Sequence, residues 1–104
     1  SLLNFMNEKK PFLNPEITLS NLASELLVAP EYLSGIINNK LGKNFYDFIN
    51  HYRIEEFKTR SVADENKKFT LLSIAYDCGF NSKATFNRVF KNVTGITPGE
   101  YTSR

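Results

Sequence analysis

Apolar residues recur along this chain at intervals of three and four positions, which is the spacing of one face of an α-helix. The clearest row follows Ser82 and contains Phe86, Val89, Phe90 and Val93. Strict alternation of apolar and polar residues, which is typical of β-strands, is weak throughout the sequence. The pattern therefore predicts an all-α protein, and the turn-forming residues divide it into seven helices.

Residues that favour turns and helix ends divide the first half of the chain. A short amphipathic helix is expected over residues 1–10, and the two prolines of "KKPFLNPEI" end it because they lack amide donors. Thr18 is suited to cap a second helix, Pro30 to open a third, and Gly42 to end that third helix in a left-handed conformation. The apolar residues expected to be buried here are Leu19, Leu22, Ala23, Leu26, Leu27, Leu33, Ile36, Ile37 and Leu41.

The second half begins with a long helix, expected at about residues 45–62, whose roughly 18 residues would extend about 27 Å. The polar run "ADENKK" is expected to close it. Gly95 is expected to end the sixth helix, and Thr97 and Glu100 have the spacing of a capping box at the start of a seventh. The other expected caps are Asn44, Thr70 and Ser82, and the other expected anchors are Phe45, Phe48, Ile49, Tyr52, Phe57, Leu71, Leu72, Ile74, Ala75 and Cys78.

The third and sixth predicted helices repeat one pattern. Leu33 aligns with Phe86, which lies 53 positions later, and Gly42 aligns with Gly95 at the same offset. Each copy consists of a helix, a short turn and a second helix, which is the helix-turn-helix arrangement whose second helix enters the DNA major groove. A pair of helices is also a common unit of any helical bundle, so the repeat alone leaves nucleic-acid binding and simple packing open.

The net charge of +2 is small, but the positive charge is unevenly distributed. Residues 1–68 carry equal numbers of basic and acidic side chains, and residues 69–79 contribute only Asp77. The stretch from residue 80 onward carries one acidic residue, Glu100, and four basic ones, Lys83, Arg88, Lys91 and Arg104. The distribution therefore favours a polyanionic partner for the C-terminal part of the chain.

The chain holds one cysteine, Cys78, and one histidine, His51. A single cysteine forms no internal disulfide, and this pair cannot supply the ligands of a Cys/His zinc site. We therefore expect no metal, no cofactor and no catalytic activity. No apolar run is long enough to span a bilayer and no signal-peptide core is visible, so we expect no contact with a membrane and a cytoplasmic location.

Two long segments resemble a known family of bacterial proteins. The stretch "LLSIAYDCGFNSKATFNRVFKNVTGITPGEY" is similar to the C-terminal signature of AraC-type (arabinose-regulator-like) transcription regulators. The stretch "LASELLVAPEYLSGIINNKLGKNFYDFINHYRIEEF" is similar to the family's first helix-turn-helix and linker helix. The resemblance covers essentially residues 5–104 and is carried by Ile74, Ala75, Gly79, Phe80, Ser82, Phe86, Arg88, Phe90, Lys91, Gly95, Thr97, Pro98 and Tyr101.

This resemblance implies one DNA-binding domain spanning residues 1–104, with a first helix-turn-helix at about 18–42, a linker helix at about 45–62 and a second helix-turn-helix at about 70–95. Its third and sixth helices would occupy successive major-groove segments of double-stranded DNA and bind a specific sequence. RNA polymerase would be a further partner through the parent regulator. The alternative left open by the residues is a helical protein-interaction module whose DNA face has weakened.

Helical geometry places one face of the sixth helix opposite its apolar row. Arg88 on this face is suited to a bidentate contact with guanine, and Asn87 to a contact with adenine or phosphate. The resemblance assigns base reading to this face, with Arg88, Asn87, Ala84 and Lys83 as candidates, and backbone contacts to Ser82, Thr85 and Lys91. A solvated basic stripe is the alternative.

The matching face of the third helix offers weaker candidates. Gly35 stands where the sixth helix has Arg88, and Ala29 stands where it has the capping Ser82. Glu31 is able to accept from cytosine, although a carboxylate near phosphates is repulsive. The base-reading candidates here are Glu31, Ser34 and Gly35, and the backbone candidates are Asn38 and Asn39. Asn44 and Thr97, at the starts of the fourth and seventh helices, are further backbone candidates, with capping alone as the alternative.

Overall fold

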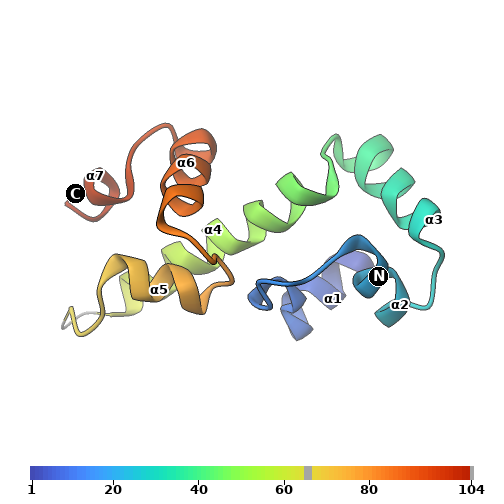
Figure 1. The fold of residues 1–104 in the computed structure, drawn as a ribbon, viewed down its shortest axis with the longest axis horizontal. Helices are drawn as coiled ribbons and strands as arrows, with labels where there is room; N and C mark the ends of the chain where they lie inside the picture. The colour runs from blue at the N-terminus through green and yellow to red at the C-terminus, as the bar shows by residue number, and fades with distance from the viewer. Residues whose placement is uncertain (65–66, 104) are drawn as a thin grey trace.

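The computed structural model describes residues 1–64 and 67–103, so Glu65 and Asn66 of the expected closing run, and the basic Arg104, lie outside the described residues. The described part contains seven α-helices and no β-strand, which confirms the all-α prediction. Figure 1 shows α4 crossing the middle of the molecule between α1–α3 and α5–α7. The elements are α1 (Leu2–Lys9), the 3-10 helix η1 (Pro11–Leu13), α2 (Leu19–Glu25), α3 (Pro30–Gly35), the π-helix η2 (Ile36–Lys40), α4 (Phe45–Ala63), α5 (Leu71–Asp77), α6 (Lys83–Thr94) and α7 (Pro98–Thr102).

Side chains cap the helices where the sequence predicted caps. Each predicted cap accepts a hydrogen bond from the backbone amide three residues later, at 2.7–3.1 Å: Thr18, Asn44, Thr70, Ser82 and Thr97. Such a bond satisfies an amide that has no partner within the helix and is worth about 1 kcal/mol. Thr97 N also donates to Glu100 Oε1 at 3.0 Å, which completes the predicted capping box. Ala29, at the start of α3, provides no side-chain cap.

The helices bury two separate apolar cores, and α4 contributes to both. Phe48 and Ile49 of α4 belong to the N-terminal core, with Met6, Phe12, Leu22, Ala23, Leu33 and Ile37. Ile54 and Phe57 of α4 belong to the C-terminal core, with Ile74, Ala75, Cys78, Phe80, Phe86, Val89 and Phe90. We call α1–α3 with η1 and η2 the N-terminal unit, and α5–α7 the C-terminal unit. These are the two predicted helix-turn-helix subdomains, and α4 is the predicted linker helix.

Four apolar residues lie outside the cores to which their spacing assigned them: Ile36 and Leu72 are half-buried, and Leu27 and Val93 are exposed. Leu27 is 91% exposed, because α2 ends at Glu25 and Leu27 itself turns the chain with a φ of 60°. Val93 is 42% exposed, because it borders a surface groove between α6 and α4 rather than the C-terminal core. The predictions that these four residues belong to the cores were therefore wrong.

The second helix of each helix-turn-helix ends differently. In the first, α-helical hydrogen bonding stops at Gly35 and the chain continues as the π-helix η2, which the sequence did not predict. In the second, α6 remains α-helical to Thr94. Gly42 and Gly95 follow with φ values of 67° and 86°, which confirms the left-handed conformation predicted for Gly42 and the helix end predicted at Gly95.

The molecule measures 43 × 24 × 21 Å. Its long axis runs from the C-terminal unit to the N-terminal unit, and in the view of Figure 1 α6 lies above the middle of α4, whereas α3 lies to the right of the upper end of α4. Within the described residues, no helix has both the length and the apolar content that crossing a bilayer requires.

Candidate nucleic-acid interface

The helix α6 turns its apolar side to the C-terminal core and its polar side to solvent. Phe86, Val89 and Phe90 are buried in that core. Two further candidates, Ser82 and Thr85, are half-buried, and Ser82 Oγ accepts a hydrogen bond from Thr85 N at 3.0 Å. The exposed candidates, which we call the α6 face, are Lys83, Ala84, Asn87, Arg88 and Lys91. The structure therefore brings all seven sixth-helix candidates together on α6 and its N-cap residue, and five of them are exposed.

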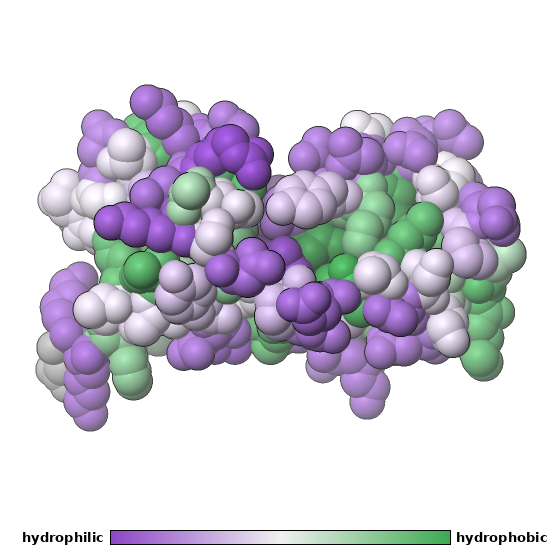
Figure 2. Space-filling model, viewed as in Figure 1, coloured by the Kyte–Doolittle hydropathy of each residue, from purple (hydrophilic) through white to green (hydrophobic). Residues whose placement is uncertain are grey.

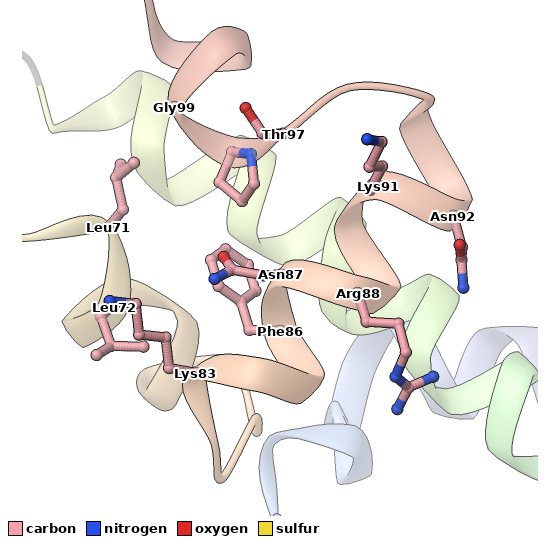
Figure 3. Close-up of a pocket in the computed structure, with 11 residues that line it drawn as sticks. Leu71, Leu72, Lys83, Phe86, Asn87, Arg88, Lys91, Asn92, Thr97 and Gly99 are labelled. Atoms are coloured by element: carbon pink, nitrogen blue, oxygen red, sulfur yellow. The ribbon is translucent and has the colours of Figure 1, made fainter.

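The α6 face borders a surface hollow of about 580 Å³. Its other walls are the first turn of α5, with Leu71 and Leu72, and the first turn of α7, with Pro98. Figure 3 shows Lys83 and Asn87 on the flank of α6 that faces α5, whereas Arg88 extends from the other flank. Cationic groups at the edge of such a hollow are suited to an anionic partner that lies across it.

A groove of about 450 Å³ lies between α6 and the first half of α4. Figure 2 shows the corresponding notch between the two halves of the molecule. Arg88 and Asn92 of α6 line both this groove and the hollow, so the α6 face continues into the groove. Asn92 was missed by the sequence reasoning, although it lies four residues after Arg88 and therefore on the same helical face. The opposite wall of the groove consists of Lys43, in the loop before α4, and of Tyr46, Asp47, Asn50 and His51 of α4.

The helix α3 presents a surface with less positive charge. Glu31 is exposed, as are Asn38 and Asn39 in the π-helical turn that follows, and Ser34 and Gly35 are half-buried. Asn38 Nδ2 donates a hydrogen bond to Ser34 Oγ at 3.3 Å, so these two polar side chains are engaged with each other. The structure thus brings the first-unit candidates together, but few of them offer an unengaged donor.

Two details of α3 bear on its role. A methyl group added at Gly35 would meet nothing closer than Asn39 Nδ2 at 3.9 Å, so packing within the protein does not require glycine there. Tyr32 is 62% exposed and was not among the candidates. The repeat in the sequence could have identified Tyr32 as a candidate, because a shift of 53 positions pairs it with the candidate Thr85.

Comparison with known proteins identifies the family. A model of the helix-turn-helix domain matches residues 22–104. The chain belongs to the AraC-type helix-turn-helix family. This is a family of transcription regulators that are not known as enzymes, which agrees with the expectation that this chain catalyses no reaction.

The AraC-type fold is similar to several solved structures. A DNA-binding transcriptional dual regulator from Escherichia coli K-12 has a TM-score of 0.81 and 27% identity, over 99% of this chain and 92% of that one. The C-terminal domain of AraT, a response regulator from Geobacillus stearothermophilus, has a TM-score of 0.77 and 25% identity, over 98% of this chain and 83% of that one. These likenesses confirm two helix-turn-helix subdomains joined by a linker helix.

Similar sequences occur within much longer proteins. YtdP, an uncharacterized HTH-type transcriptional regulator of Bacillus subtilis, is 31% identical over 86 residues, which is 83% of this chain and 11% of YtdP. An uncharacterized HTH-type transcriptional regulator of Staphylococcus aureus is 36% identical over 87 residues, which is again 83% of this chain and 11% of that protein. This AraC-type chain therefore spans about a tenth of the length of these two relatives.

The remaining backbone candidates of the AraC-type domain lie at helix starts. Thr97 precedes α7 and lines the same hollow as Lys83 and Lys91. Asn44 precedes α4 and follows Lys43, which lines the groove between α4 and α6. Both side chains already cap their helices, so a phosphate at either position would be met mainly by backbone amides.

The groups that a catalytic or metal site would need are unsuited to either role. Cys78 is buried in the C-terminal core, where burial raises the pKa of its thiol to about 12. A thiol that stays protonated at neutral pH is a poor nucleophile and a poor metal ligand. Among residues 1–64 and 67–103, no three His, Cys, Asp or Glu side chains lie close enough together to hold a metal ion.

Proposed function

We propose that this AraC-type domain binds double-stranded DNA at specific sequences, as the DNA-reading part of a bacterial transcription regulator. In this proposal α6 occupies one major-groove segment and α3 occupies the next. The observation that carries it is the α6 face, where Lys83, Arg88 and Lys91 stand exposed on a helix whose other side is buried in the C-terminal core. A capped and well-packed helix holds such side chains in fixed positions, as base reading requires.

Arg88 is the principal reader in this proposal, because a guanidinium can donate two parallel hydrogen bonds to O6 and N7 of guanine. Asn87 contacts N6 and N7 of adenine, or a phosphate, and Lys83 and Ala84 lie against the neighbouring base edges. Contacts with the DNA backbone position a helix without adding sequence information. On α6 these contacts come from Ser82, Thr85 and Lys91.

The helix α3 contributes less to base reading. Glu31 accepts from a cytosine amino group, while Ser34 and Gly35 face base edges and supply no strong contact. Much of the recognition in this segment therefore depends on DNA shape. The 43 Å length of the molecule suits two major-groove segments on one side of DNA, which lie about 34 Å apart. The residues that contact phosphates outside α6 are Asn38, Asn39, Asn44 and Thr97.

Selection of bound duplexes from a random library, followed by footprinting, tests the proposal. We expect two protected segments about one helical turn apart, and an affinity that falls as the salt concentration rises. Arg88→Ala should reduce the discrimination between selected and scrambled duplexes by about 1–3 kcal/mol, whereas Lys91→Ala should weaken binding to all duplexes alike. Lys9→Ala is the matched control, because Lys9 is an exposed cation at the end of α1. Lys9→Ala should change neither the discrimination between duplexes nor the overall affinity for them.

The outcomes separate the possible functions. Unchanged discrimination in Arg88→Ala would show that Arg88 does not read bases. No affinity of the wild-type protein for any duplex at low salt would favour the alternative, a helical protein-interaction module. If DNA binding holds, RNA polymerase is the partner that we propose for the full-length regulator.

A further inference from the structure

Arg53 is buried between the two units although its guanidinium carries a charge. It is 7% exposed and lies on α4 between Ile49 of the N-terminal core and Ile54 of the C-terminal core. The three ion pairs within the described residues involve other side chains, so no described carboxylate neutralises Arg53. Burial lowers the pKa of Arg53, and Tyr46 acts in the opposite direction. A buried charge without an ionic partner is costly, so its hydrogen bonds are the features that explain it.

The guanidinium of Arg53 holds the N-terminal unit through two backbone carbonyls. Nε donates to Phe12 O at 2.8 Å, and Nη2 donates to Asn14 O at 3.0 Å. Phe12 belongs to η1, and Asn14 is the residue that ends it. Nη1 donates to Asn50 Oδ1 at 3.3 Å, one turn earlier on α4, which fixes the orientation of the planar group.

The C-terminal unit packs against the same group. Arg53 Cζ lies 5.9 Å from the centre of the Phe80 ring, which belongs to the C-terminal core. Gly79 adopts a φ of 108°, and a methyl group in its place would overlap Phe12 O and stand 2.7 Å from Arg53 Nε. The turn that leads into α6 therefore meets Arg53 and η1 at one point. The extensive packing elsewhere lies within one unit or involves α4.

We propose that Arg53 is a positioning residue that fixes the two units relative to each other and thereby sets the spacing of the two DNA segments that the domain binds together. This inference rests on the proposed function. A rigid connection raises the effective concentration of the second reading helix at one spacing and lowers it at the others. Without the guanidinium, the units remain joined by α4 but lose their shared anchor, so α3 adopts a range of orientations relative to α6.

The test compares affinities for the selected duplex and for one with five base pairs inserted between the protected segments. Wild type is expected to lose about 100-fold in affinity on this insertion, which turns the second segment to the other side of the DNA. Arg53→Met fills the site without hydrogen-bond donors, and this variant is expected to lose less than about 5-fold in affinity on the same insertion. Leu22→Ala is the matched control, because it perturbs the N-terminal core away from Arg53. It should keep the spacing dependence of wild type.

A second measurement requires no DNA. Spin labels at Asn21→Cys and Asp77→Cys, both exposed and in different units, report the distance between the units. We expect a narrow distance distribution with Arg53 and a broader one with Arg53→Lys, which keeps the charge but not the fork of donors. Arg53→Lys also takes the place of Arg53→Met in the binding assay if the latter does not fold.

The results distinguish this inference from the function on which it rests. The same spacing dependence in wild type and in the Arg53 variants would overturn the inference and leave the proposed function intact. Distance distributions of equal width would overturn it in the same way. Failure of wild type to bind any duplex would overturn both.

Discussion

Replacing Gly79 with alanine tests how closely the second helix-turn-helix packs on the N-terminal unit. A Cβ at this position would overlap Phe12 O and stand 2.7 Å from Nε and 3.3 Å from Cδ of Arg53. The Phe12 carbonyl cannot move away freely, because it accepts the 2.8 Å hydrogen bond from Arg53 Nε. The methyl group must therefore displace the turn, the carbonyl or both.

Two costs determine the size of this effect. Holding a residue with a side chain at positive φ costs about 1–2 kcal/mol. Displacing Phe12 O weakens a hydrogen bond to a buried charged group, which is worth about 1.5–3 kcal/mol. We therefore expect Gly79→Ala to lower the free energy of unfolding by about 3–4 kcal/mol. A change of that size should lower the Tm of a domain of this length by more than about 12 °C.

Gly95→Ala supplies the matched control for urea denaturation followed by circular dichroism. Gly95 has a φ of 86°, and a Cβ there would meet no atom within 4 Å. This variant therefore reports the cost of the backbone conformation alone, about 1–2 kcal/mol. The difference between the two variants measures the contact with Phe12 and Arg53. Equal losses in Gly79→Ala and Gly95→Ala would show that the Gly79 turn does not pack closely on Phe12 and Arg53, and would remove one support for the positioning role of Arg53.

Two further predictions concern stability. Burial raises the pKa of Glu56, but hydrogen bonds from Arg60 at 2.9 Å and Lys10 at 3.2 Å outweigh it, and the pKa lies below its ordinary value. A carboxyl group whose pKa is lower in the folded state than in the unfolded state stabilises the fold at pH values above the unfolded-state pKa. This stabilisation is lost as the pH falls through the folded-state pKa. Glu56→Gln should therefore lower stability by about 1 kcal/mol at pH 7, and the deficit in thermal unfolding should vanish towards about pH 3; a constant deficit would contradict the linkage. Leu27→Asn should raise the stability by about 0.5 kcal/mol in the same assay, because asparagine tolerates the φ of 60° better than leucine, and a marked loss would mean that Leu27 is a core residue.

The helix starts and the α6 face were predictable because both are local properties. A cap such as Ser82 accepts from an amide three residues later, and this bond needs no contact with the rest of the protein. Once Phe86 and Phe90 are assigned to the core, the 3.6-residue period places Arg88 on the outside of the same helix. The likeness of the two helix-turn-helix copies was also visible, because it depends on spacing alone.

Features that depend on contacts between distant segments were not predictable in this way. Leu27 has the spacing of the α2 stripe, but the helix ends before reaching it. Arg53 occupies an ordinary polar position in the linker helix, and its burial depends on acceptors at Phe12 and Asn14, about forty positions earlier. The groove that Asn92 borders forms where α6 lies beside Lys43 and the first half of α4, which are distant from it in the sequence. No periodicity in the sequence indicates any of these three arrangements.

In the proposed function, the connection between the units is important because α3 and α6 are unequally equipped to bind DNA. The α6 face carries three cations, whereas the exposed candidates on α3 and its π-helical extension are one carboxylate and two amides. In the proposed binding mode, a helix with so few donors binds weakly by itself, so α3 adds affinity mainly after α6 has placed it against the DNA. The free energy that α3 adds then depends on how narrowly α4 and Arg53 hold it. A site with an intact α6 segment and the wrong spacing would be bound as though α3 were absent.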